Sequence, residues 1–506
     1  MRMRKIDNPG LTQNRDSPKG GETENTIAIS RRAWFTLALL SSTLLTVFFS
    51  ETMLLPAIPE IIQDFNITYG TAAWIFSAYL IVAAVMTPVA GRLSDLYGKK
   101  KVLLILLIVY ITGLVTGGFA DNISTLLVTR IIQGVGLAAV PAAFSLLRDT
   151  FPPAKLAIAV GVFGSAYSAG SVVGLLVGAS IIQNFGWHLT FLAIIPFSVL
   201  VTIMIAKFVK EDKKSYQMDS VKPREPTSSR KRASFPIDIK GVAALSVTIT
   251  SFLIALTLIQ IGVNSQNILH IAGAFVTSAI SLSIFVILER KIVPPFLDLR
   301  LLRHKILLPS YILLIAAGIT MFMIYPTIVQ LVRSPIPLGF GGDSVDVANV
   351  QLPFMITFLV FASITPFIIN RIGSIKPMII GGVISLFGAL GLTLFHSTEF
   401  ALSTSLAIVA SGLSLTMTAT WNMVVSSSPK EFTGISVGVG ALLLFIGMAI
   451  GPALAGVYME NHVTVEGIEG SYPSAGSYNL IFLTAGLLSS VTVGSALMLR
   501  RAAHST

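Results

Sequence analysis

The sequence Gly91-Arg-Leu-Ser-Asp-Leu-Tyr-Gly-Lys-Lys-Lys101 lies between two apolar runs, Thr71–Ala90 and Val102–Ala120. Each run is long enough to cross the hydrocarbon core of a bilayer as a helix, which takes about 20 residues. The joint between them holds a single acid, Asp95, among basic residues, and short cytoplasmic loops of membrane proteins collect Lys and Arg. The stretch therefore predicts two membrane helices joined by a cytoplasmic turn.

The composition of the whole chain also indicates a membrane protein. Hydrophobic residues make up 53% of the 506 residues and charged residues 12%, whereas a soluble domain carries about 25% charged residues. The net charge of +11 therefore needs no nucleic acid as a partner. The chain has no cysteine, which excludes disulfides, Cys-ligated zinc and iron–sulfur clusters. Its six His are scattered and no phosphate-binding loop is present, so we expect no enzyme, no metal and no cofactor.

The apolar runs predict an all-α integral membrane fold with fourteen transmembrane helices. We expect these helices at residues 33–57, 70–92, 101–120, 124–147, 156–182, 187–209, 239–262, 268–289, 306–332, 348–369, 377–396, 401–425, 433–458 and 478–499. Of the 35 Lys and Arg residues, all but Arg130 and Arg333 then fall in tails, helix ends or loops on a single side of the membrane. That asymmetry predicts that both termini are cytoplasmic.

An internal repeat predicts two related halves. Asn370–Lys376 resembles Asp95–Lys101, and Gly447-x3-Gly451 resembles Gly170-x3-Gly174, each about 275 residues further on, as in transporters built from repeats. We therefore expect two pseudo-symmetric six-helix bundles and an inserted two-helix hairpin. The predicted segments are a cytoplasmic tail (1–32), the first bundle (33–209), a cytoplasmic linker (210–238), the hairpin (239–289), a cytoplasmic connector (290–305), the second bundle (306–499) and a second cytoplasmic tail (500–506).

Glu51 is the main candidate for chemistry, because it lies inside the first predicted helix. A charged residue within a membrane span costs about 2.5–3.5 kcal/mol even on the lenient insertion scale, so such residues usually face a cavity or a partner. Burial favours the neutral form of a carboxyl group, and Glu51 is therefore a candidate proton carrier. The alternative is a glutamate near the outer end of the helix that touches water.

Arg130 is the only cation inside a predicted span and lies at a depth similar to that of Glu51. A guanidinium beside a carboxyl group favours its charged form, so the pair could set the proton affinity of Glu51. Arg130 could instead bind backbone carbonyls and lock the packing of the helices.

Three motifs of this chain resemble the major facilitator superfamily, and within it the fourteen-helix drug:proton antiporter branch. The joint matches the superfamily's motif between helices 2 and 3 at Gly91, Asp95, Gly98, Lys99 and Lys100, and departs from it at Leu96. Leu126-x3-Arg130-x2-Gln133-Gly134 is similar to the helix-4 motif, and Pro295–Arg303 is similar to the segment before helix 9 of that branch. The resemblance implies that Glu51 stands for the acid of helix 1, and that the joint is a conformational latch. A local salt bridge between Asp95 and Lys99 is the alternative.

The helix-5 motif of antiporters is incomplete here. Gly170, Gly174 and Gly178 keep its glycines, but Leu175 stands where the family has proline, whereas Gly451-Pro452 keeps the pair in helix 13. We expect these glycines, together with Gly134 and Pro452, to serve helix packing. The missing proline leaves symport open beside antiport.

A cavity between the halves would be lined by aromatic and polar residues from several spans. The candidates are Trp74, Tyr79, Gln133, Phe163, Tyr167, Tyr325, Gln330, Trp421, Asn422 and Phe445. We expect a monomeric carrier of the cell membrane that exports amphipathic or cationic drug-like molecules by alternating access, driven by a proton gradient. The alternatives are proton-coupled uptake or export of a metabolite, and a membrane receptor or scaffold that does not transport. The partners would be the lipid bilayer, protons and a small-molecule substrate.

Overall fold

The computed structural model describes residues 30–210, 239–260, 267–291, 304–428, 433–461, 463–464 and 472–504. Within these ranges the regular secondary structure is helical apart from one antiparallel ribbon, β1 (Val463–Thr464) paired with β2 (Tyr472–Pro473). Fourteen segments of the described chain are long and apolar enough to cross a membrane, which confirms the predicted fold class and number of spans.

Three of the first six spans are built from more than one helix. The six spans are α1 (Arg31–Thr52) with η1 (Leu55–Ala57) and α2 (Ile58–Phe65), α3 (Tyr69–Tyr97), α4 (Lys99–Gly117), α5 (Ile123–Leu137) with α6 (Ala139–Thr150), α7 (Pro153–Phe185), and α8 (His188–Ala193) with α9 (Ile195–Phe208). The later eight are single helices: α11 (Ile239–Gln260), α12 (Ile268–Lys291), α13 (Leu307–Arg333), α14 (Ser344–Ile372), α15 (Ile375–Leu394), α16 (Glu399–Ser427), α17 (Thr433–Asn461) and α18 (Ala475–His504).

The first span differs most from its predicted bounds. It reaches Phe65 rather than residue 57, because the chain restarts as helix twice after α1. Pro56 lies at the start of η1 and Pro59 at the start of α2, where proline is tolerated because its missing N–H would have no partner in the helix. The span ends at Asn66, whose φ of 49° is left-handed. α2 is a short amphipathic helix of 8 residues, and its polar residues are the reason why the predicted span stops before it.

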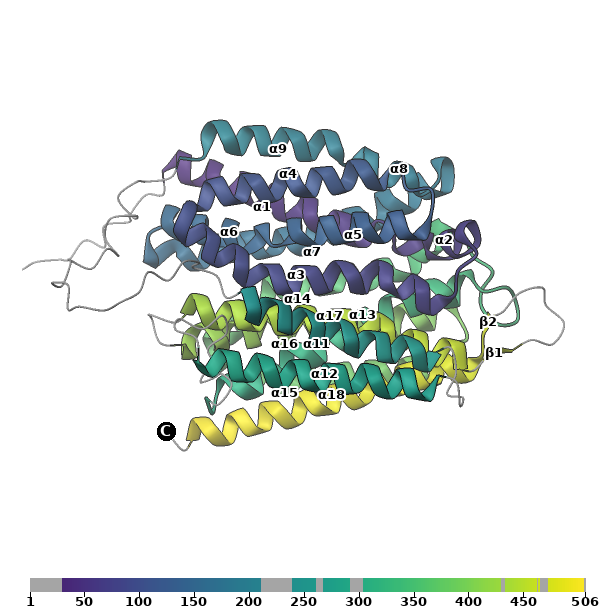
Figure 1. The fold of residues 1–506 in the computed structure, drawn as a ribbon. Coiled ribbons are helices and arrows are strands. Elements are labelled where there is room, and N and C mark those ends of the chain that lie inside the picture. The colour runs from purple at the N-terminus through teal and green to yellow at the C-terminus, as the bar shows by residue number, and fades with distance from the viewer. Residues whose placement is uncertain are drawn as a thin grey trace, which may run out of the picture.

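The helices lie side by side along one direction, with α1–α9 in the upper part of Figure 1 and α11–α18 in the lower part. We call these two groups the first and the second half. Across their boundary α3 packs against α17 and α7 packs against α14. The hairpin of α11 and α12 joins this boundary through α11, which packs against both α3 and α17. The predicted segment bounds stay predictions, and much of the N-terminal tail, the linker and the connector lies outside the described residues.

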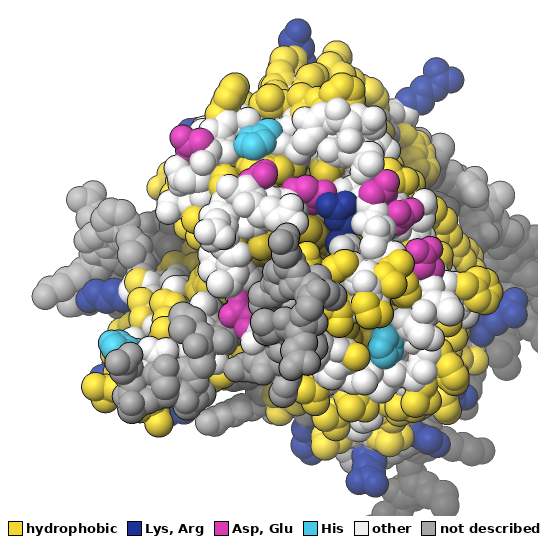
Figure 2. Space-filling view, turned by 90° about the vertical axis from the view of Figure 1, so that its right-hand side faces the viewer, with side chains coloured by type: hydrophobic (Ala, Val, Ile, Leu, Met, Phe, Trp, Pro, Cys, Tyr) yellow, Lys and Arg dark blue, Asp and Glu magenta, His cyan; other side chains and the backbone are white. Residues whose placement is uncertain are grey.

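The two ends of the molecule differ in charge. The C-terminus lies at the left-hand end of Figure 1, together with the basic ends of the helices, and α2 lies at the right-hand end. The face at the α2 end carries acidic side chains around one basic side chain (Figure 2). Among the described residues, Arg333 is the only Lys or Arg at this end. The predicted orientation, which rests on the same positions of Lys and Arg, would place the α2 end outside. We refer to it below as the outer end.

Candidate functional site

Glu51 lies in the last turn of α1, just before the chain breaks into η1 and α2. Its side chain is 3% exposed, and neither carboxyl oxygen has a hydrogen-bond partner. Almost all buried polar groups in proteins are hydrogen-bonded, so two unpartnered oxygens on one buried carboxyl group are unusual. This packing accommodates a protonated carboxyl group better than a carboxylate, because a buried charge without donors costs several kcal/mol.

The glycines of α7 hold α1 in place next to Glu51. A Cβ atom at Gly170 would lie 2.5 Å from the backbone oxygen of Leu45, and one at Gly178 would lie 2.6 Å from that of Met53. Gly174, between them, contacts the backbone of Phe49 equally closely. The predicted glycines therefore lie directly against the backbone of the first span, one turn of helix after another.

This contact gives a prediction with a matched control in the same helix. Gly174→Ala should lower the melting temperature of the purified protein by several degrees, because the new methyl group overlaps the backbone of α1. Gly164→Ala should leave it unchanged or raise it slightly, since a Cβ atom there meets nothing within 4 Å and alanine favours helix. Equal melting temperatures for the two variants would contradict the packing role of Gly174.

Arg130 of α5 is completely buried beside the end of α1. Its Nη1 atom donates to Oε1 of Gln133 at 2.8 Å and to the backbone oxygen of Ser50 at 3.4 Å. The guanidinium lies over the rings of Phe76, Tyr79 and Phe191, with its Cζ atom 5.4–5.8 Å from their centroids. These cation–π contacts partly replace the water that the cation has lost.

Glu51 and Arg130 are neighbours but do not form an ion pair. Arg130 binds the carbonyl of Ser50, the residue that precedes Glu51. The ion pairs of the described chain join other residues, Lys99 to Asp149 and Arg333 to Glu60. Two guanidinium nitrogens, Nε and Nη2, have no hydrogen-bond partner either. The site therefore holds an acid and a cation whose hydrogen-bonding capacity is partly unused.

Gln133 and Gly134 complete this site from α5. Gln133 links Arg130 to α4: it accepts the hydrogen bond from Arg130, and its Nε2 atom donates to the backbone oxygen of Gly113 in α4 at 3.2 Å. Gly134 lets α5 approach α3, since a Cβ atom there would lie 2.9 Å from Cβ of Val82 and against the carbonyl oxygen of Tyr79. The hydroxyl of Tyr79 is buried without a partner, and the ring of Tyr79 lies 5.4 Å from Cζ of Arg130.

The structure places the predicted cavity residues in several parts of the molecule. Tyr79 and Gln133 lie with Arg130, whereas Tyr167 and Tyr325 belong to an aromatic cluster between the halves. Phe163 is buried against Phe144, with ring centroids 6.3 Å apart. Trp421 packs against Gly440 and Asn422 is exposed, both in the half of α16 away from the outer end. Trp74 donates to Thr257 of α11 at 2.8 Å. Phe445 is buried in the core.

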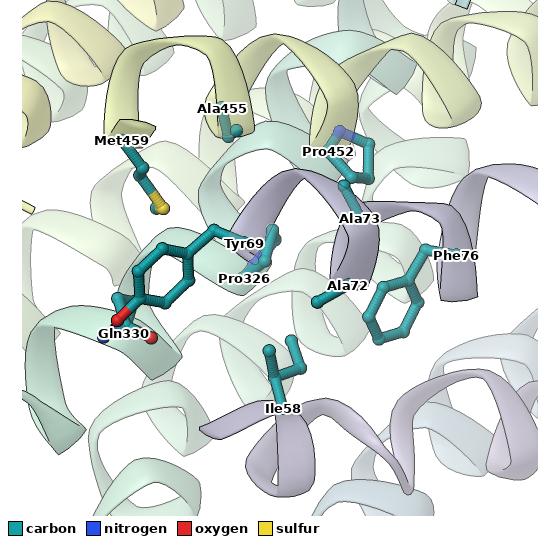
Figure 3. A pocket seen from close by; sticks show the side chains of 11 residues that line it. Ile58, Tyr69, Ala72, Ala73, Phe76, Pro326, Gln330, Pro452, Ala455 and Met459 are labelled. Atoms are coloured by element: carbon teal, nitrogen blue, oxygen red, sulfur yellow. Dashed lines mark hydrogen bonds between the residues drawn. The ribbon is translucent and has the colours of Figure 1, made fainter. Parts of the chain in front are cut away.

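A small cavity does exist near the outer end, between the two halves (Figure 3). Ile58, Ala72 and Phe76 line it from the first half, and Pro326, Gln330, Pro452 and Met459 line it from the second. Gln330 donates through Nε2 to the hydroxyl of Tyr69 at 2.8 Å, while its Oε1 atom has no partner. Neighbouring Gly451 packs α17 on α13, since a Cβ atom there would lie 2.7 Å from the backbone nitrogen of Met323.

The sequence missed the polar contacts that join the halves at the outer end. Arg333 of α13 donates to Oε1 of Glu60 in α2 at 2.5 Å, and the Ser344 hydroxyl donates to the same oxygen at 3.1 Å. The backbone nitrogen of Gly70 donates to Oε1 of Glu460 at 2.6 Å. The position of Arg333, as the one cation of an acidic end, could have indicated such a contact.

The joint between α3 and α4 makes its described contacts inside the first half. Gly98 has a φ of 101°, a conformation that favours glycine, and it ends α3. Lys99 pairs with Asp149 at 2.5 Å, and Lys100 donates to the backbone oxygen of Ala206 at 2.7 Å. A Cβ atom at Gly91 would meet nothing within 4 Å, so close packing does not require that glycine. The side chain of Asp95 lies outside the part that the structure describes, and the latch stays a prediction.

No group of three or more His, Cys, Asp or Glu side chains in the described chain could hold a metal ion. The described site holds one carboxyl group, that of Glu51, and one guanidinium, that of Arg130, where the first span breaks after α1.

Comparisons with known proteins agree with this arrangement of helices. The sequence is 24% identical over 458 residues to the tetracenomycin C resistance and export protein of Streptomyces glaucescens, covering 89% of this chain and 80% of that protein. It is 26% identical over 459 residues to multidrug resistance protein 3 of Bacillus subtilis (strain 168), covering 88% and 84%. The structure resembles that of the human organic anion transporter MFSD10 (TETRAN), with a TM-score of 0.62 at 16% identity over 92% of this chain and 99% of the other.

A family model settles the membership that the motifs of the first four helices predicted. The model of the Major Facilitator Superfamily matches residues 40–452, which run from within α1 to within α17. With its multi-pass helical fold and its match to transporters over most of its length, the chain belongs to the Major Facilitator Superfamily and is a membrane transporter rather than an enzyme.

Proposed function

We propose that this transporter exports amphipathic or cationic drug-like molecules in exchange for protons, by alternating access, from the cytoplasm of a cell across its cytoplasmic membrane. The observation that carries the proposal is Glu51, a buried carboxyl group without hydrogen-bond partners, beside Arg130 and at the end of α1. Such a group can take up a proton and release it again when the surrounding helices move. We propose that the protein transports as a monomer.

The names of the relatives support the choice of cargo. One similar protein is named for resistance to tetracenomycin C and its export, and another for multidrug resistance. A carboxylate close to aromatic rings suits a cargo that is both apolar and cationic. Because Glu51 can hold either a proton or the charge of a cationic cargo, the two would compete and exchange.

The packing of the first span indicates a conformation in which the two halves are in contact, and thus closed, at the outer end. η1 and α2 pack against α13, and η1 also packs against α14, whereas α1 packs mainly against α7, α9 and α6 of its own half. The broken helix therefore links Glu51 to the contact between the halves. Glu60, which accepts the hydrogen bonds from Arg333 and Ser344, lies nine residues after Glu51 on the same span.

A transport assay tests the function itself. The purified protein is reconstituted in liposomes, a proton gradient is imposed, and accumulation of ethidium and of a panel of other toxic cations is measured. We expect uphill accumulation that needs the gradient and collapses with a protonophore. Drug-independent uptake of a metabolite down the proton gradient would instead favour symport, the alternative that Leu175 of α7 keeps in place.

The closed outer end gives a further prediction. Because the chain has no native cysteine, a thiol-specific linker can react only with cysteines that are introduced. A Glu60→Cys/Ser344→Cys variant treated with a short bis-methanethiosulfonate linker should stop transporting, because the halves can no longer part at this end. Dithiothreitol should restore the rate. The two single-cysteine variants treated in the same way are the controls, and a linked protein that transports as fast as the unlinked one would contradict alternating access at this end.

A further inference from the structure

Six aromatic rings form a continuous path between the two halves. From the first half come Phe48 and Tyr167, with ring centroids 4.1 Å apart, and Tyr167 lies 6.4 Å from Phe358 of the second half. The path continues through Phe354 and Tyr325 to Phe322, with centroids 5.4–6.2 Å apart. Met321 and Met355 lie beside the rings. We call these eight residues the midplane aromatic cluster, since they lie in the middle parts of the first span (Arg31–Phe65), α7, α13 and α14.

The two tyrosines of this cluster donate to sulfur rather than to oxygen. The hydroxyl of Tyr167 lies 4.0 Å from Sδ of Met321, and that of Tyr325 lies 3.6 Å from Sδ of Met355. A thioether sulfur is a weak acceptor, and a buried hydroxyl gains when it can donate to oxygen instead. Each half therefore presents one donor, buried in Tyr325 and partly buried in Tyr167, that an oxygen atom would satisfy better than its present partner does.

The cluster lies next to the proposed proton site. Phe48 precedes Glu51 by less than one turn of α1, and its ring lies 4.1 Å from that of Tyr167. An aromatic cation whose rings lay in the cluster would thus have its charge within reach of Glu51. Because the rings come from both halves, the cluster parts when the halves separate, and its ring faces become available.

We propose that the midplane aromatic cluster is a cargo subsite for planar aromatic molecules that carry an oxygen acceptor, and that Tyr167 and Tyr325 donate to that oxygen. This inference rests on the proposed function and gives it a class of cargo. The rings provide faces for stacking. The methionines provide a polarisable surface that adapts to different shapes, so the subsite accepts several ring systems and selects them by their acceptor oxygen.

The experiment compares two planar aromatic cations, doxorubicin with its quinone oxygens and ethidium without a carbonyl oxygen. Binding to the purified full-length protein is measured by the change in ligand fluorescence. Tyr325→Phe should weaken doxorubicin binding about three- to tenfold, the effect of losing one hydrogen bond, and change ethidium binding less than about twofold. Tyr167→Phe should act in the same way.

Met355→Leu is the matched control, because it removes the sulfur acceptor and keeps the hydroxyl of Tyr325. Doxorubicin should bind this variant at least as tightly as the wild type. Equal losses for both ligands in Tyr325→Phe, or a wild type that binds neither ligand, would overturn the subsite. Binding is measured without a proton gradient, so a protein that shows the expected selectivity but no proton exchange would refute the proposed function and leave the subsite standing.

Discussion

Glu51→Gln is expected to abolish drug-dependent proton movement while the protein still folds and still lets drug equilibrate down its own gradient. Glutamine has the shape of the protonated carboxyl group, and the oxygens of Glu51 lie unpartnered in a packing that suits a neutral group. It cannot release a proton, however, so the step that couples the two gradients is lost. We expect the coupled proton flux to fall below detection.

The measurement uses inside-out vesicles or liposomes loaded with a pH-sensitive dye, to which the drug is added. The control is Glu399→Gln, which makes the same chemical change at an exposed residue in the first turn of α16. That variant should retain the wild-type flux. If Glu51→Gln moves protons as the wild type does, Glu51 is not the proton carrier, whatever else it contributes.

Arg130→Lys is expected to reduce transport at least about tenfold, because an ammonium group cannot make the same set of contacts. The guanidinium reaches Gln133 and the carbonyl of Ser50 while it lies over three aromatic rings. A lysine in this fully buried position would lose those contacts and tend to give up its proton, which would remove the positive charge beside Glu51.

Transport and melting temperature should be measured on the same preparation, because a buried arginine also stabilises the packing. The control is Arg371→Lys at an exposed position in the last turn of α14, which should leave both quantities unchanged. Gln133→Leu separates the role of Arg130 as a cation in transport from its role in helix packing, since this variant removes the hydrogen-bond acceptor of Arg130 but keeps the cation. Normal transport by Arg130→Lys would show that the planar guanidinium is not needed.

Prediction from the sequence was accurate for features that depend on neighbouring residues. The apolar runs predicted the number of spans, and the glycines at helical spacing in α7 predicted a close helix contact. The bounds of the first span were wrong because α2 is amphipathic, and Glu60 and Asp64 there face polar partners at the outer end. The predicted cavity residues lie in several places, because hydropathy does not indicate which face of a membrane helix packs against which neighbouring helix.

The sequence by itself determined that the protein is a multi-pass helical transporter, because the length and apolarity of a membrane span are local properties that the bilayer imposes on each helix separately. It also determined that Glu51 and Arg130 are candidates for function, because a charged side chain within a membrane span costs free energy. Only the tertiary structure decided that these two lie together without an ion pair, and that Glu60 meets Arg333 from the other half. Such contacts depend on how helices distant in the chain rotate and pack, and packing between spans is set by shape and polar pairing rather than by hydropathy.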